Sequence, residues 1–208
     1  MGWKKEFFSN TGRPLGLSGR LMVSCMNRGH AAVSDWGLSH LPESSASAIA
    51  DLGCGGGRNA AVLLDRYPDA FVTALDYSPV SVNRTRRVNR AAVEQRRCRV
   101  LQGNVASLPL KSGQYDLVTA FETIYFWPGP VDSFREVERI LKPGGSFLIV
   151  NEADGTSEKD ARWTQVVEGM RLWTPEQVCR FLHQAGFGRV TVFRRRKHRW
   201  IAFLAEKI

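Results

Sequence analysis

The chain has 208 residues, 43% hydrophobic and 24% charged, as in an ordinary globular protein large enough to bury a core. No apolar run reaches the roughly 18–20 residues of a membrane-spanning helix, and the first residues lack the apolar stretch of a secretory signal. The four cysteines are widely spaced without a CxxC pair, so we expect reduced thiols in a cytoplasmic protein. The net charge of +9 leaves nucleic acid open as a partner.

Residues 1–46 precede the first predicted strand and contain aromatic residues and a helical pattern that Gly29 interrupts. A cofactor-binding core does not need such a segment. Two interpretations stay open, a cover over the substrate side or a helix packed on the sheet. His30 and His40 lie in this segment, either as candidate bases or as ordinary surface histidines.

Strand and helix signals alternate from residue 48 onward. Apolar, β-branched runs predict five strands, at 48–51, 71–76, 99–103, 115–121 and 146–150. Helical periodicity and capping residues predict helices at about 57–67, 78–95, 131–141 and 174–184, with a short helix and loop over 153–173. Two final strands, at about 188–195 and 199–206, predict an antiparallel pair.

This order predicts an α/β, Rossmann-like fold. We expect a mostly parallel seven-stranded sheet with an antiparallel C-terminal hairpin, helices on both faces and an N-terminal helical cover. One domain spans 1–208 in this prediction, with the cover at 1–46, a cofactor-binding core at 47–151, and a substrate-side segment with the edge hairpin at 152–208. Ligands of such sheets bind beyond the carboxyl ends of the strands, so the candidate site residues are the strand-end residues.

A glycine-rich turn follows the first strand. Asp51, Gly53, Gly55 and Gly57 form an acid-x-Gly-x-Gly-x-Gly pattern at a predicted helix start. Glycine adopts turn angles closed to other residues and lets a ligand approach the main chain. The free N–H groups of the helix start favour a polar or negatively charged group. The dinucleotide fingerprint G-x-G-x-x-G fails when counted from Gly53, because its third glycine position holds Arg58.

Two further motifs follow in the same half of the chain. Asp76 ends the second strand, where a carboxylate can accept both ribose hydroxyls of a nucleoside. Lys142-Pro143-Gly144-Gly145 stops a predicted helix before an apolar strand. With the glycine turn and Gly103-Asn104-Val105 after the third strand, these motifs over about 48–151 resemble the class I methyltransferases that depend on S-adenosylmethionine (SAM). The resemblance is to a type 11-like methyltransferase domain of small-molecule enzymes.

The resemblance implies SAM as the cofactor and S-adenosylhomocysteine (SAH) as its product. It places the methionine end of SAM at Asp51, Gly53, Cys54, Gly55 and Gly57, the ribose at Asp76, and the adenine at Asn104 and Val105, with Tyr77 and Phe121 completing the set. The family commonly has aspartate where this chain has Asn104, but an amide oxygen also accepts a hydrogen bond from the adenine amino group.

The stretch 121–127 is the predicted acceptor side. Glu122 can accept a proton or hold a cationic amine, and Tyr125 can line an apolar pocket, so these two are the candidate catalytic residues. The alternative is an aromatic clamp on the cofactor, with Glu122 capping the backbone. Glu152 is a weaker candidate of the same kind as Glu122. No spaced cluster of His, Cys and acidic residues indicates a metal site, so we predict none.

The sequence therefore predicts methyl transfer from SAM to a small molecule, mainly by positioning and desolvation. An RNA methyltransferase that uses the basic segments 84–99 and 194–199 is one alternative. The stretch after the fourth strand lacks both the Asn/Asp-Pro-Pro-Tyr/Phe tetrapeptide and the Pro-Cys nucleophile of base-modifying enzymes. A non-catalytic SAM-binding module is a second alternative, and an NAD-dependent oxidoreductase fits worst.

Overall fold

The computed structural model describes residues 29–41, 46–195 and 197–208. The first part of the predicted N-terminal helix lies outside these ranges, as does Cys25. The strands are β1 (Ala48–Leu52), β2 (Phe71–Asp76), β3 (Cys98–Gln102), β4 (Tyr115–Phe121), β5 (Leu141–Asn151), β6 (Phe187–Arg195) and β7 (Trp200–Lys207). The helices are α3 (Ala31–Leu38), α4 (Arg58–Arg66), α5 (Pro79–Val88), α6 (Arg90–Glu94), the 3-10 helix η1 (Ile124–Phe126), α7 (Pro130–Ile140), α8 (Glu158–Val166) and α9 (Pro175–Gln184).

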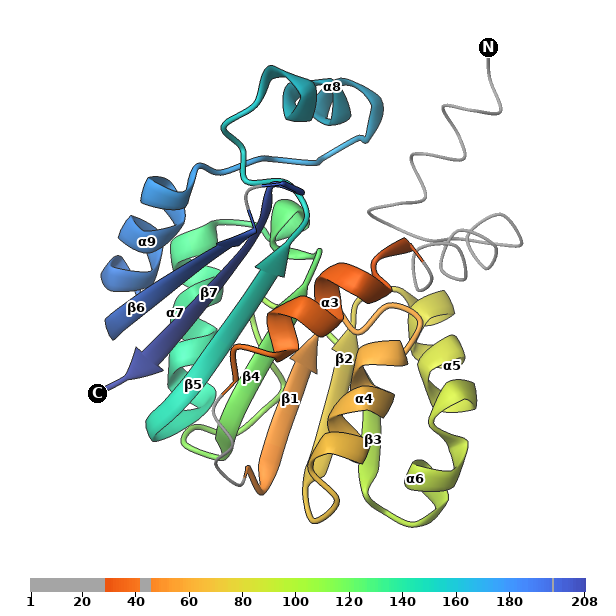
Figure 1. Cartoon of the computed structure of the whole chain (residues 1–208). Helices are drawn as coiled ribbons and strands as arrows, with labels where there is room; N and C mark the ends of the chain where they lie inside the picture. The colour runs from red at the N-terminus through yellow and green to blue at the C-terminus, as the bar shows by residue number, and fades with distance from the viewer. Residues whose placement is uncertain (1–28, 42–45, 196) are drawn as a thin grey trace.

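The strands form one seven-stranded sheet in the order β3-β2-β1-β4-β5-β7-β6. Strands β1 to β5 pair in parallel, and β7 is antiparallel to both of its neighbours, β5 and β6 (Figure 1). This topology confirms the predicted Rossmann-like sheet with its antiparallel hairpin. The chain reverses its direction of travel across the sheet between β1 and β4, which is where open α/β sheets bind their ligands.

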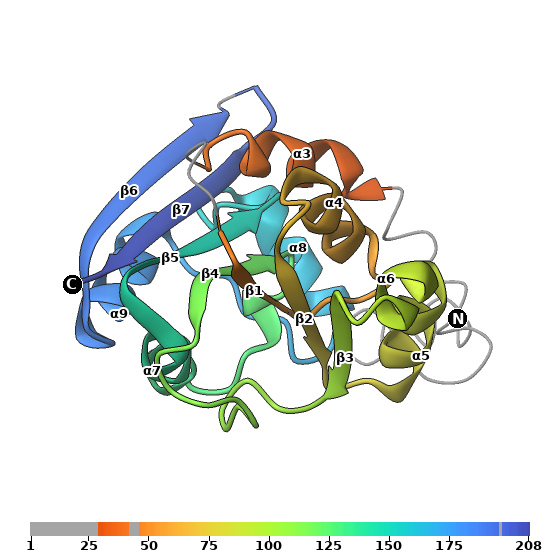
Figure 2. The same cartoon turned by 90° about the horizontal axis from the view of Figure 1, so that it is seen from below.

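Helices cover both faces of the sheet, as the alternating pattern predicts. On one face α7 and α9 bury Phe134, Val178 and Leu182 against the strands. On the other face α3 and α4 contribute Val33 and Leu63 to a second apolar cluster. The view from below separates the two layers (Figure 2).

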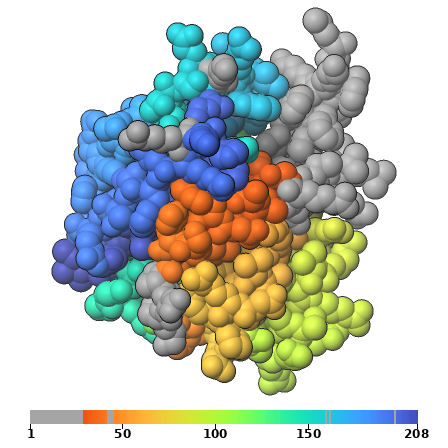
Figure 3. Space-filling model, in the orientation of Figure 1, coloured from red at the N-terminus to blue at the C-terminus, as the bar shows by residue number. Residues whose placement is uncertain are grey.

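Helix α3 packs directly on the sheet. Gly37 lies so close to β5 that an added Cβ atom would sit 2.3 Å from a methyl group of Val150. Figure 3 shows α3, in orange, filling the space between the blue C-terminal hairpin and α4. The interpretation as a helix packed on the sheet therefore holds for α3. The residue before it, His30, lines the cavity described below, and the cover over the substrate side stays a prediction.

Two predicted elements differ from the observed bounds by more than a residue or two. The helix expected over 78–95 breaks into α5 and α6 at Asn89, whose side chain donates to the carbonyls of Thr85 and Gly57. The last parallel strand begins at Leu141 and not at residue 146. Leu141 already pairs with Tyr115, and a register shift then accommodates the Pro-Gly-Gly segment within the strand. Within the described residues, no helix combines the length and the apolar character needed to span a bilayer.

Candidate active site

The glycine turn between β1 and α4 depends on left-handed backbone angles. Gly53, Gly55 and Gly57 have φ of 73°, 50° and 81°. An added Cβ on Gly53 would also sit 2.2 Å from Oγ1 of Thr123, so this position excludes a side chain sterically as well. The amides of Gly53 and Cys54 both donate to the carbonyl of Leu75, at 2.8 and 3.0 Å, which folds the turn over the end of β2.

Two polar residues of the helical segment after β2 donate hydrogen bonds to backbone carbonyls of the glycine turn. Thr85 Oγ1 donates to the carbonyl of Gly55 at 3.0 Å, and Asn89 Nδ2 donates to the carbonyl of Gly57 at 3.0 Å. Both side chains are buried. Neither residue was predicted from the sequence, because two polar residues four positions apart on an arginine-rich helix look like part of a solvated face.

We expect Thr85→Val to weaken the turn. The carbonyl of Gly55 would lose its hydroxyl donor in a partly buried place, which costs about 1–3 kcal/mol when the group is left unpaired. Urea unfolding should show a lower free energy of unfolding, and calorimetry should show weaker binding of SAH. Thr85→Ser keeps the hydroxyl and should behave like the wild type. Equal behaviour of the valine and serine variants would contradict this role.

Two carboxylates lie under and beside the turn. Asp76 Oδ2 accepts from the amide of Gly55 at 2.9 Å, and its Oδ1 accepts from the amide of Ser78 at 2.9 Å. Asp51 is buried in β1, where its Oδ1 accepts from the Thr119 hydroxyl at 2.8 Å and no described residue donates to its Oδ2. Burial raises the pKa of Asp51 to about 7; the Thr119 bond opposes this shift and the charge of Asp76 adds to it. Burial also raises the pKa of Asp76.

A cavity of about 810 Å³ opens beyond the carboxyl ends of β1, β2, β3 and β4, within the size range of small-molecule sites. It is lined by nine of the predicted residues: Gly53, Cys54, Gly55, Asp76, Tyr77, Asn104, Val105, Phe121 and Glu122. The other three predicted residues, Asp51, Gly57 and Tyr125, are buried and do not line it. His30, a candidate base, also lines the cavity, as do Thr123, Phe126 and Trp127 of the stretch 121–127. Ser34 and Arg58 line it without having been predicted.

Asn104 has a local role as well. Its Oδ1 accepts from the amide of Ala106 at 3.0 Å, which stabilises the turn after β3. An amide oxygen has a second lone pair, so this bond leaves an acceptor for a ligand. Val105, beside it, packs partly against the apolar core.

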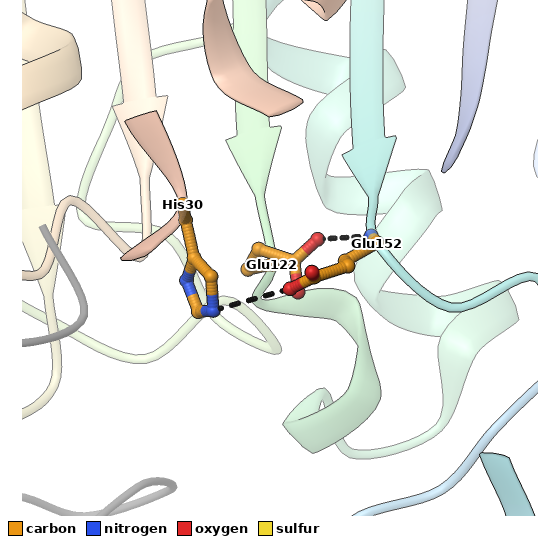
Figure 4. A group of neighbouring side chains, drawn as sticks. All are labelled: His30, Glu122 and Glu152. Atoms are coloured by element: carbon orange, nitrogen blue, oxygen red, sulfur yellow. Dashed lines mark hydrogen bonds and ion pairs between the residues drawn. The ribbon is translucent and has the colours of Figure 1, made fainter. Parts of the chain in front are cut away.

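Two glutamates follow neighbouring strands. Glu122 follows β4 and lines the cavity, and Glu152 follows β5. Because β4 and β5 are parallel neighbours, with Phe121 paired to Val150, the two glutamates lie side by side (Figure 4). The amide of Glu152 donates to the carboxylate of Glu122. Burial, and then the charge of Glu152, raises the pKa of Glu122 to about 8.

His30 approaches the same place from the start of α3. Its Nε2 lies 3.6 Å from a carboxylate oxygen of Glu152. Burial lowers the pKa of His30, although the negative charge of Glu152 acts in the opposite direction. Tyr125 lies behind this group, with its hydroxyl accepting from the amide of Ala153 at 3.2 Å. Burial raises the pKa of Tyr125 well above its ordinary value, so its phenol keeps its proton.

Known proteins that resemble this chain include methyltransferases. Residues 50–149 match the family model described as a methyltransferase domain. The chain belongs to the class I SAM-dependent methyltransferases. A malonyl-[acyl-carrier protein] O-methyltransferase of Geobacter sulfurreducens is 32% identical over 70% of this chain and 57% of the relative. The enzyme of that name from Herminiimonas arsenicoxydans is 28% identical over 80% of this chain and 61% of the relative.

The class I methyltransferase fold also extends over most of the chain. An O-methyltransferase family protein from Burkholderia thailandensis superimposes with a TM-score of 0.79 at 18% identity, covering 91% of this chain and 60% of that one. The chain thus spans about three fifths of the length of these relatives.

Proposed function

We propose that this class I methyltransferase binds SAM in the cavity and transfers the methyl group to a small-molecule nucleophile. The observation that carries the proposal is the order of the cavity-lining residues that follow the adjacent strands β1, β2 and β3. The open glycine turn after β1, the carboxylate of Asp76 after β2, and Asn104 with Val105 after β3 follow one another in the order of the methionine, ribose and adenine parts of SAM.

Bound SAM supplies an activated methyl group, whose bond to sulfur breaks as the bond to the acceptor forms, and the acceptor's proton departs to a base or to solvent. The protein then has to place the acceptor in line and exclude water. Glu122, Phe126 and Trp127 line the cavity wall next to Gly53, and we assign them to the acceptor side. Tyr125, which does not line the cavity, positions the segment after β5 through Ala153.

An oxygen nucleophile is the first acceptor class to test, because the two bacterial relatives are named O-methyltransferases. The RNA alternative finds little support in the basic segment 84–99. Arg86 donates to the carbonyl of Val100 at 3.1 Å, and Arg97 donates to the carbonyl of Leu64 at 3.0 Å. These guanidinium groups join elements of the fold.

The test is stabilisation of the full chain by SAM, SAH and NAD in thermal unfolding. A ligand at 100 times its dissociation constant should raise the free energy of unfolding by about 2.7 kcal/mol. We expect SAM and SAH to stabilise the protein and NAD to have no effect. Stabilisation by NAD alone, or by none of the three, would refute the proposal. SAM binding without turnover of any acceptor across hydroxyl, carboxyl, thiol and amine compounds would favour the non-catalytic module.

A further inference from the structure

Three side chains from distant parts of the sequence converge beside the cavity, which His30 and Glu122 line. His30 precedes α3, Glu122 follows β4 and Glu152 follows β5. One potential ligand atom from each, an imidazole nitrogen and two carboxylate oxygens, lies within 4.8 Å of the others. Figure 4 shows the imidazole ring and both carboxylates directed toward one another.

The arrangement places like charges together with little compensation. The two carboxylates are adjacent, and the nearest partner with basic character is the imidazole of His30. Among the cavity-lining residues that the structure describes, Arg58 is the only lysine or arginine. Its guanidinium is already paired with both oxygens of Asp35, at 2.7 Å each. A cation between the carboxylates would therefore favour the charged forms of both, for which the described cavity-lining residues supply no unpaired lysine or arginine.

The donor set is one that metal ions use. An imidazole with two carboxylates suits Zn²⁺ and Mn²⁺, whereas Mg²⁺ and Ca²⁺ prefer oxygen atoms alone. Donors bound to one Zn²⁺ lie about 2.0–2.2 Å from it and hence at most about 4.4 Å apart. The 4.8 Å limit of the cluster is close to this value, and the half-exposed side chain of Glu152 is free to rotate by the small amount required.

We propose that His30, Glu122 and Glu152 bind a divalent transition-metal ion whose remaining positions open into the cavity. No metal was predicted from the sequence, because the three residues have no regular spacing. Only the register of β4 and β5 and the position of α3 bring them together. This inference rests on the proposed function. In it, the ion holds the methyl acceptor through an oxygen atom of the acceptor. This selects acceptors with a hydroxyl or carboxylate near the methylated atom.

The test uses the full chain, treated with EDTA and then titrated separately with MnCl₂ and ZnCl₂ by calorimetry, with SAH binding measured in parallel. We expect one ion per chain. Glu152→Gln and His30→Gln should each weaken metal binding by at least about tenfold, since even changes to residues that only hydrogen-bond a metal ligand cost about 10–100-fold. Glu168→Gln, at an exposed glutamate, is the matched control and should bind as the wild type does. Mn²⁺ is the stricter probe, because cysteine thiols attract Zn²⁺.

Three results would overturn the proposal. These are no binding of either ion to wild type, equal binding by wild type and both ligand variants, or binding of Zn²⁺ alone that Glu152→Gln leaves unchanged. Retained SAH binding in the same samples shows that each variant is folded and that the cofactor site is intact. A protein that binds SAH but no metal refutes this inference alone, whereas a protein that binds no SAH refutes the proposed function.

Discussion

Asp76→Ala should lose most of its affinity for SAM and SAH. A carboxylate hydrogen bond to a ribose hydroxyl is charge-assisted and contributes about 1.5–3 kcal/mol, so loss of both ribose contacts should weaken binding by about 100-fold or more. The variant also removes the acceptor for the amides of Gly55 and Ser78, which would loosen the glycine turn. Calorimetry with SAH measures the loss.

The matched control is Asp69→Ala, at an exposed aspartate before β2. It removes the same charge without touching the cavity and should bind SAH as the wild type does. Urea unfolding of both apo variants separates a binding defect from a folding defect. Wild-type affinity in a folded Asp76→Ala protein would show that the ribose contact is assigned to the wrong residue.

Asp51 should make the stability of the apo protein fall as pH rises. Its carboxyl has a pKa of 3.8 when unperturbed and about 7 in the folded protein, because burial disfavours its charged form. The folded state therefore holds a proton that the unfolded state has lost, over a window from about pH 4 to pH 7. Because the pKa is about three higher in the folded state, the free energy of unfolding should fall by about 4 kcal/mol across this window. This loss of stability is absent below pH 4, grows from pH 4 to pH 7 and is complete above pH 7.

Asp51→Asn tests this dependence because asparagine does not titrate. Its oxygen can still accept from Thr119, while its amide nitrogen would replace Oδ2, to which no described residue donates. The measured quantity is the difference in the free energy of unfolding between variant and wild type, followed from pH 4 to pH 8 in urea. We expect the difference to shift in favour of the variant by about 4 kcal/mol, whatever its value at pH 4. A difference that stays constant with pH would contradict the raised pKa.

The lining of the cavity at the ends of β1, β2 and β3 was largely predictable from the sequence, for a physical reason. The acid and glycines of the turn and Asp76 lie on short local segments at strand ends, so strand periodicity alone places them at one edge of the sheet. Nine of the twelve predicted residues line the cavity. Asp51 is an instructive exception, since its alternation in β1 points it into the protein, under the turn and beside Thr119.

The cluster of His30, Glu122 and Glu152 could not be predicted in the same way. Glu122, Glu152 and His30 were each candidates, but their proximity was not predicted. It is set by long-range features, the β4–β5 register and the close contact of Gly37 with Val150. The supports of the turn, Thr85 and Asn89, depend on how α5 packs against the turn. Local periodicity contains no information about such contacts, which tertiary packing decides.

The position of β7 has a consequence for how the protein is made. β7 is the last described strand to leave the ribosome, yet it lies inside the sheet, paired with β5 on one side and β6 on the other. Until residues 200–207 emerge, β5 has no neighbour on one edge and the apolar side chains of Ile201 and Phe203 are missing from the core. A nascent chain stalled before this point exposes a long unpaired strand, which invites association with other chains. The sheet is thus complete only after the last of its seven strands has been made, and a truncation at residue 199 should yield aggregates and not a smaller folded protein.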